Sequence, residues 1–297
     1  KDKKFNILIV CFSFFLLPFF RSSAMWANAH LTAVIFFLIA NFFYLKSKKN
    51  NQFFFKLLNL FFLSLATYSL QSYVILYVFY LYRYFKSENL KTFLNLFFFS
   101  CILGAPGLYF IIHINPRAAN LPFTEDIFFN LCFNFTLIFF YLLFVLSNKE
   151  NIKLFYNGLH QIKVIHIFLL ILIFFVIVFN LNFELLNSSL KGGGFFYKVS
   201  HFIFKNNSFF IFVFFLSLFT IFNFIKISKN LIELIVIVNL MSINVAIYQK
   251  YFELSFLIFL FVLNENYIVK NVISNIKNSL SFYLVAIFYL LISYINY

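Results

Sequence analysis

Long apolar runs separated by short polar segments dominate the chain. The runs lie at roughly 5–20, 31–45, 92–113, 127–146, 165–182, 208–225, 231–247, 252–263 and 280–296. About 20 apolar residues in a helix cross the roughly 30 Å of hydrocarbon in a bilayer, so most of these runs suit a membrane-spanning helix. The pattern predicts an all-α fold, a polytopic transmembrane helical bundle that forms a single integral membrane domain over residues 1–297.

The stretch 52–85 fits either one long helix or two short helices that are broken near 69–72. The positions of Lys and Arg decide between them, because cytoplasmic loops carry an excess of both. With two helices and the N-terminus inside, 17 of the 23 basic residues lie on the inner side. With one helix the split is 12 to 11, which is no bias. We therefore predict two short helices here and about eleven membrane segments in all.

The composition agrees with this topology and excludes other classes of protein. Hydrophobic residues make up 63% of the chain and charged residues 11%, whereas a soluble domain has about 45–50% and about 25%. This excludes a soluble globular enzyme, a disordered chain and a nucleic-acid-binding module. The basic residues behind the net charge of +14 are a topology signal, and their excess on the inner side predicts a cytoplasmic N-terminus. We expect the protein in the bacterial inner membrane. The three cysteines are scattered, and no motif indicates a metal or another cofactor.

The predicted topology also sorts the other polar residues. The inner loops are short and rich in Lys and Asn, and we interpret them as solvated turns. The outer segments are more varied, and 182–208 is the longest of them. Varied polar chemistry at a membrane boundary favours a binding site. The candidate substrate-binding residues are Arg21, Trp26, Gln71, Arg117, Lys198 and His201.

Each candidate also has a simpler interpretation. The guanidinium groups of Arg21 and Arg117 suit a phosphate, but the same groups anchor helix ends or are simply solvated. Trp26 is either a sugar platform or a residue of the interfacial aromatic belt. The adjacent carboxylates Glu125 and Asp126 precede a predicted helix, where they act as a general base or stabilise the helix N-terminus. The sequence leaves these alternatives open.

The segment 18–46 (PFFRSSAMWANAHLTAVIFFLIANFFYLK) resembles membrane glycosyltransferases of the GT-C type. In those that use dolichyl-phosphate-glucose, a Phe-Arg-x-Thr-Asn-x-x-Trp segment opens a helix. Here Phe20 and Arg21 match, Ser and Ala replace Thr and Asn, and Trp26 comes one position early. The segment 249–264 (QKYFELSFLIFLFVLN) is similar to the Glu-Phe-Arg-Tyr-like stretch near the end of that family. Together the two segments cover about 45 residues.

The resemblance implies transfer of a sugar from a polyprenyl-phosphate-linked donor to an acceptor at the outer membrane face. Such enzymes usually keep an acidic catalytic residue in the first outer loop, and residues 21–30 contain none. Because the chain begins with Lys1 rather than Met, we expect an N-terminally truncated chain whose base precedes Lys1. Within the chain itself, Asp126 and Glu125 are the catalytic candidates. The cations Arg21, Arg117 and Lys198 would neutralise the phosphate.

Two other functions remain open from the sequence. An O-antigen-type polysaccharide polymerase or ligase has a similar number of helices and a large basic outer loop, which 182–208 would supply. A non-enzymatic flippase or transporter of lipid-linked oligosaccharides is the third hypothesis. Transporters carry broken helices at corresponding places in two halves, and 52–85 is the one stretch that the sequence predicts to be broken.

Overall fold

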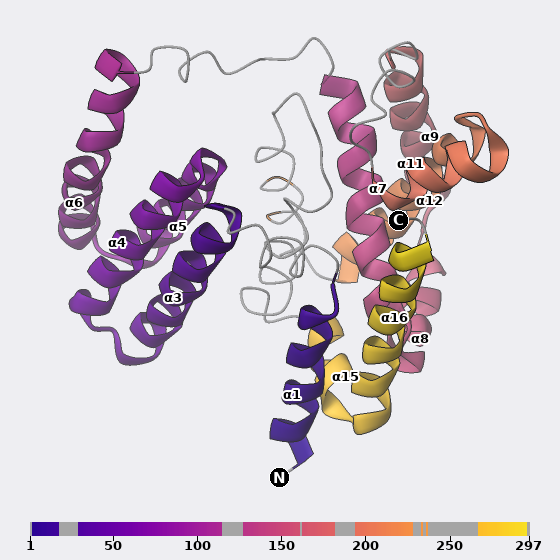
Figure 1. Cartoon of the computed structure of the whole chain (residues 1–297), viewed down its shortest axis with the longest axis horizontal. Helices are drawn as coiled ribbons and strands as arrows, with labels where there is room; N and C mark the ends of the chain where they lie inside the picture. Colours follow the sequence, from indigo (N-terminus) through magenta and orange to yellow (C-terminus); the bar gives the residue numbers. More distant parts are fainter. Residues whose placement is uncertain are drawn as a thin grey trace. The chain divides into compact units, whose positions relative to one another are not determined.

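The computed structural model describes residues 2–17, 29–114, 127–160, 162–181, 194–227, 233, 236 and 267–295. Within this part of the chain every regular element is a helix, which confirms the all-α prediction. The chain divides into two compact units (Figure 1). Unit 1 combines Lys1–Ser22 with Thr124–Tyr297, and unit 2 is Ser23–Phe123. The single membrane domain expected over 1–297 stays a prediction.

The described residues of unit 2, 29–114, form four consecutive helices. They are α3 (Ala29–Asn50), α4 (Phe53–Ser69), α5 (Val74–Ser87) and α6 (Leu90–Tyr109), with a 3-10 turn η1 (Gln71–Tyr73) before α5 and a π turn η2 (Phe110–Ile114) after α6. The α-helical pattern stops at Leu70, whose backbone is extended (φ −149°, ψ 113°). The stretch 52–85 therefore forms two helices, as the charge distribution predicted. At 17 and 14 residues they are about 25 and 21 Å long.

Side-chain contacts fix the directions of the helices in unit 2. The rings of Phe36 and Phe62 pair, as do those of Phe43 and Phe55, so α3 and α4 are antiparallel. The connection through η1 returns the chain, and Tyr84 Oη reaches Asn59 Oδ1 at 3.1 Å. At the far end of α4, the Tyr68 hydroxyl donates to the carbonyl of Leu103 in α6.

One end of unit 2 consequently collects the two tight connections between its helices, and the opposite end carries η1. The end with the tight connections also carries a set of cationic side chains, namely Lys46, Lys48, Lys49, Lys56, Arg83, Lys86 and Lys91. This is the end that the excess of basic residues assigned to the inner side of the membrane.

The described residues of unit 1 form longer helices and several short ones. The helices are α1 (Asp2–Phe15), α7 (Ile127–Leu146), α8 (Lys149–Leu159), α9 (Val164–Phe179), α11 (Phe195–Val199), α12 (Ser208–Ile227), α15 (Tyr267–Ser274) and α16 (Ile276–Ile295), and a π turn η4 (Ser200–Phe204) extends α11. Aromatic side chains fill the core between α7, α12 and α16. Among them, Tyr141 and Phe214 are completely buried.

The long helices of unit 1 alternate in direction. Phe133 packs on Phe210 at 4.9 Å, and nearby Phe135 packs on Phe214, so α7 and α12 are parallel. Helix α16 runs against α7, and α9 runs against α12. Helix α1 runs with α16. The pairs that fix these three directions are Ser147 with Ser281, Phe140 with Tyr289, His166 with Phe222, Phe174 with Phe214, Asn6 with Ile273, and Phe14 with Phe282. These are the relative directions that the predicted topology requires.

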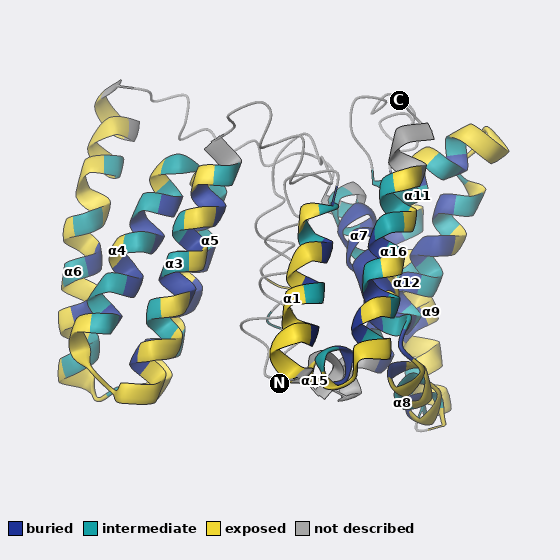
Figure 2. Ribbon diagram, turned by 60° about the horizontal axis from the view of Figure 1, so that its bottom comes forward, coloured by how far each residue is buried: buried dark blue, intermediate teal, exposed yellow. Residues whose placement is uncertain are grey.

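Many apolar side chains of the long helices point away from the protein core. In α9, Val164 and Phe179 are each 82% exposed and Phe168 is 60% exposed, whereas Leu170 and Ile177 are buried. Figure 2 shows this exposure along α9. Apolar side chains exposed on most sides of a helix suit contact with lipid rather than with water. The exposed surface of α9 therefore fits a membrane protein.

Helix length gives a stricter test. Leu31–Asn50 and Leu90–Tyr109 are long and apolar enough to cross a membrane. Shorter apolar helices are Phe53–Ser69, Asn130–Leu146, Ser208–Asn223 and Ile276–Leu291. The described residues do not establish eleven spans, and the runs predicted at 231–247 and 252–263 lie almost wholly outside them.

Helix α8 corrects the expectation that the inner loops are simple turns. Asn148 caps it, since its Oδ1 accepts a hydrogen bond from the backbone N–H of Glu150 at 2.9 Å. The helix buries Asn151 and Gly158 and meets α9 at an angle of 102°. A segment with too few apolar residues for a membrane span thus still folds, because its polar groups find partners in unit 1.

Candidate functional site

The outer loop predicted over 182–208 contains an anchored helical turn. We call residues 194–207 the α11–η4 segment. Gly194 is extended and opens α11, where Tyr197 is 2% exposed. The ring of Tyr197 lies 5.3 Å from that of Phe133 in α7 and 5.5 Å from that of Phe210 in α12. Burial of this ring fixes the segment against two long helices.

A second anchor lies at the other end of the segment. The buried Ser200 hydroxyl donates to the carbonyl of Asn206 at 2.6 Å and accepts from the backbone N–H of Phe210 at 3.1 Å. Between these contacts, Lys205 adopts the left-handed conformation, with φ 51° and ψ 23°. A residue with a Cβ is seldom found there. The two bonds of Ser200 thus stabilise the tight turn that leads into α12.

His201 is held between these anchors. Its Nε2 lies 2.8 Å from Asn207 Oδ1, and its ring meets that of Tyr197 edge-on at 4.6 Å. With a carbonyl oxygen as partner, Nε2 carries the hydrogen and Nδ1 is the acceptor of the neutral ring. The imidazole is half-buried, while the ammonium groups of Lys198 and Lys205 are exposed. The exposed ammonium groups can attract an anionic group, and the His201 ring can hydrogen-bond beside it.

Gln71 lies at the break between α4 and α5, as predicted. It is the first residue of η1, and its side chain is exposed. Two residues later, Tyr73 is 1% exposed and its ring packs edge-on against Phe37 at 5.7 Å. Gln71 is therefore presented at the end of unit 2 by a turn that is itself anchored in the core.

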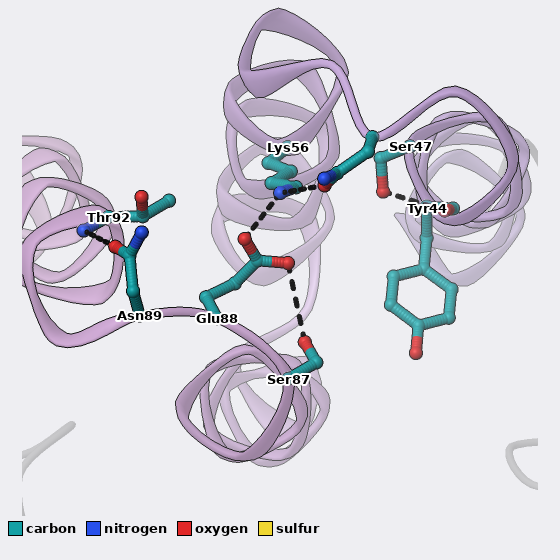
Figure 3. A network of polar contacts seen from close by, with 8 residues as sticks. Tyr44, Ser47, Lys56, Ser87, Glu88, Asn89 and Thr92 are labelled. Atoms are coloured by element: carbon teal, nitrogen blue, oxygen red, sulfur yellow. Dashed lines mark hydrogen bonds and ion pairs between the residues drawn. The ribbon is translucent and has the colours of Figure 1, made fainter.

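Sequence reasoning missed the buried ion pair at the basic end of unit 2 (Figure 3). Lys56 Nζ lies 2.5 Å from Glu88 Oε2 and donates to Asn51 Oδ1 at 2.9 Å. The side chains of Lys56 and Glu88 are 5% and 16% exposed. Asn51 follows α3 in the left-handed conformation, with φ 48°. We call Asn51, Lys56 and Glu88 the Lys56 junction, because Lys56 joins the ends of α3 and α5.

Polar contacts continue from this junction into the bundle. Asn59 is completely buried; its Nδ2 donates to the carbonyl of Ala40 at 2.9 Å, and its Oδ1 accepts from Tyr84. One turn further, the Tyr80 hydroxyl donates to Asn41 Oδ1. Such bonds hold helices together where water is excluded. Two features of the sequence could have indicated the ion pair. Lys56 lies near the start of an apolar run, and Glu88 is an acidic residue between Lys86 and Lys91.

The remaining sequence candidates are divided as follows. Lys198 and His201 belong to the α11–η4 segment of unit 1, and Gln71 belongs to unit 2. Arg21, Trp26, Arg117, Glu125 and Asp126 lie outside the described residues, and their roles stay predictions. Within the part of the chain that the structure describes, no three His, Cys, Asp or Glu side chains are grouped so that they could hold a metal ion.

Comparisons of the chain with protein-family models, with curated proteins and with solved structures found no match.

Proposed function

We propose that this chain is an integral membrane glycosyltransferase of the bacterial inner membrane, with about eleven membrane segments and a cytoplasmic N-terminus. It transfers a sugar from a polyprenyl-phosphate-linked donor to an acceptor at the outer face. The observation that carries the proposal is the α11–η4 segment. Its exposed Lys198 and Lys205, and the oriented His201, belong to the longest loop predicted on the outer face.

The chemistry of the transfer suits these groups. An acceptor hydroxyl attacks the anomeric carbon of the donor sugar, the bond from that carbon to the phosphate oxygen breaks, and the polyprenyl phosphate leaves with the electron pair. Cations near the phosphate stabilise the charge that develops on it. Lys198 supplies such a cation in the described residues, and Arg21 and Arg117 are the further candidates. A carboxylate such as Asp126 takes the hydroxyl proton.

One observation favours the polymerase or ligase as the second candidate function. The long loop is not a plain connection, because residues 194–207 form a helical turn anchored by Tyr197 and Ser200. A folded, basic outer loop suits an enzyme that holds two lipid-linked glycans. The two functions differ in their products. A glycosyltransferase adds one sugar, whereas a polymerase gives a ladder of chain lengths.

The test is transfer activity in proteoliposomes that contain the full chain and lipid-linked sugars. We expect the single variants Lys198→Ala and His201→Ala each to lower the rate by about tenfold or more, in the range found for groups that stabilise developing charge. Lys91→Ala, an exposed lysine of unit 2, is the matched control and should keep the full rate. Unchanged transfer by both test variants would refute the role of this segment.

The topology behind the proposal has its own test. Ser72→Cys is introduced into a variant in which the three native cysteines are replaced by serine. A membrane-impermeant maleimide should label this cysteine from the outer side, because Ser72 lies in η1 at the end opposite the basic residues of unit 2. Labelling from the inner side alone would overturn the assignment of two crossings to 52–85.

A further inference from the structure

One face of α8 presents basic and apolar side chains together. Lys149, Ile152, Lys153, Tyr156 and His160 are all exposed, Ile152 by 51% and Tyr156 by 58%. Spacings of three and four residues place these side chains on the same side of a helix. Figure 2 shows the exposed side of α8, and the Tyr156 and His160 rings meet there edge-on at 4.7 Å. This is the outward face of α8.

The opposite face is held firmly by the rest of unit 1. The Asn151 side chain is completely buried; its Nδ2 donates to the carbonyl of Val145, and its Oδ1 accepts from Asn271 Nδ2, each at 2.9 Å. At the penultimate residue of the helix, Gly158, α8 approaches the Asn223 side chain of α12. Asn223 Nδ2 donates to the carbonyl of Phe155 at 2.9 Å. These contacts fix which side of α8 faces outward.

The angle between α8 and α9 indicates how α8 is oriented relative to the membrane. Helix α9 exposes apolar side chains on most of its surface, as a spanning helix does, and α8 meets it at 102°. Since we predict that α9 crosses the bilayer, α8 lies close to the membrane plane on the inner side, to which the charge distribution assigned Lys149, Lys153 and Lys163. Lys163 lies in the short connection between the two helices and is also exposed.

A basic helix that lies in the membrane plane with apolar side chains on its exposed side is typical of binding to anionic lipid. We propose that the outward face of α8 binds the phosphates of anionic phospholipid headgroups in the inner leaflet, the side on which the predicted topology places α8. Lys149 and Lys153 contact the phosphates, while Ile152 and Tyr156 lie at the acyl boundary. The inference does not depend on the proposed transferase activity.

The test uses the full chain in nanodiscs with a single fluorescent reporter. Tyr156→Trp places it in α8, and Trp26→Phe removes the native tryptophan. Phosphatidylglycerol with brominated acyl chains should quench the reporter more strongly than brominated phosphatidylcholine at the same mole fraction. Each lysine near an anionic surface changes lipid binding by a factor of about five. Lys149→Gln should therefore raise the half-saturating fraction of phosphatidylglycerol about fivefold, and adding Lys153→Gln should remove the preference.

The charge-conserving pair Lys149→Arg and Lys153→Arg is the matched control and should keep the preference. Circular dichroism confirms that each variant keeps its helix content. Equal quenching by the two brominated lipids overturns the proposal, as does a preference that survives the double glutamine variant. Quenching by iodide in water without quenching by either lipid also overturns it, because the face would then point away from the bilayer.

Discussion

The Lys56 junction of unit 2 and the α11–η4 segment of unit 1 use polar side chains in opposite ways. In the junction, the ammonium group of Lys56 is buried and contacts both Glu88 and Asn51. In the segment, the contacts belong to neutral groups, such as the Ser200 hydroxyl, and the ammonium groups of Lys198 and Lys205 are exposed. One region therefore uses its charge within the fold, and the other presents its charges at the surface.

This difference separates polar groups that stabilise a membrane protein from those that can act on a ligand. A buried cation whose hydrogen bonds are made inside the protein offers little to a substrate. An exposed cation on an anchored backbone loses few contacts when an anion arrives. Stability and transfer activity should consequently respond to different variants.

Glu88→Gln should be the most destabilising variant, because it leaves the buried Lys56 ammonium without its counter-charge. Removing one partner of a buried pair costs about 3–5 kcal/mol. The free energy of unfolding in mixed micelles, followed by circular dichroism, measures the loss. Glu150→Gln changes an exposed carboxylate and should cost less than about 0.5 kcal/mol. If the two variants were equally stable, the junction would not hold unit 2 together.

Gly158→Ala should come next, because a Cβ at this position overlaps the Asn223 side chain. Overpacking of this kind costs about 1–3 kcal/mol and would displace α8 from α12. The buried Cys132 thiol reports unfolding of unit 1 when Cys11 and Cys101 are replaced by serine. Its labelling should begin at a lower temperature in the variant. Gly104→Ala, where a Cβ meets nothing within 4 Å, is the control and should leave this temperature almost unchanged.

The sequence predicted much of this fold because burial in lipid restricts both helix length and the position of charge. The run 127–146 coincides with α7 (Ile127–Leu146), and the basic residues correctly divided 52–85 into α4 and α5. Helix α8 was missed, because its stability comes from Asn151 reaching Asn271, 120 residues away. Contacts at such a separation leave no periodic signal in the local sequence.

The candidate site was predictable only in part, for a related reason. Varied polar residues in the loop 182–208 pointed to Lys198 and His201, and the structure places the His201 ring against that of Tyr197. The partners that orient them were not predicted. In the sequence, Ser200 and Asn207 look like ordinary loop residues. In the structure, the turn at the left-handed Lys205 brings Ser200 to the backbone N–H of Phe210 and Asn207 to the His201 ring. The Lys56 junction was missed because its lysine had been counted only as a topology signal.

Ser200→Ala should have a smaller effect than either backbone crowding or loss of the ion pair. The variant removes the hydroxyl that donates one hydrogen bond and accepts another at the turn of Lys205, and a typical bond of this kind contributes about 0.5–1.5 kcal/mol. The same Cys132 labelling measures it. Because the α11–η4 segment would lose its orientation, transfer activity should fall as well. Full activity with reduced stability would show that the geometry of this turn does not matter to catalysis.

Lys198→Ala should have the smallest effect on stability. It tests whether Lys198, unlike Lys56, acts at the surface rather than within the fold. An exposed side chain away from packed contacts changes the free energy of unfolding by less than about 0.5 kcal/mol, so Cys132 labelling should begin at the wild-type temperature. In Lys198→Arg, Cys132 labelling should also begin at the wild-type temperature. Because this variant keeps the charge, it should also keep most of the transfer activity. A loss of stability above about 1 kcal/mol on Lys198→Ala would place this lysine with Lys56, as a charge used within the fold. An unchanged stability together with lost transfer would separate the two regions, because the same chemical group would then stabilise the protein where it is buried and act on the substrate where it is exposed.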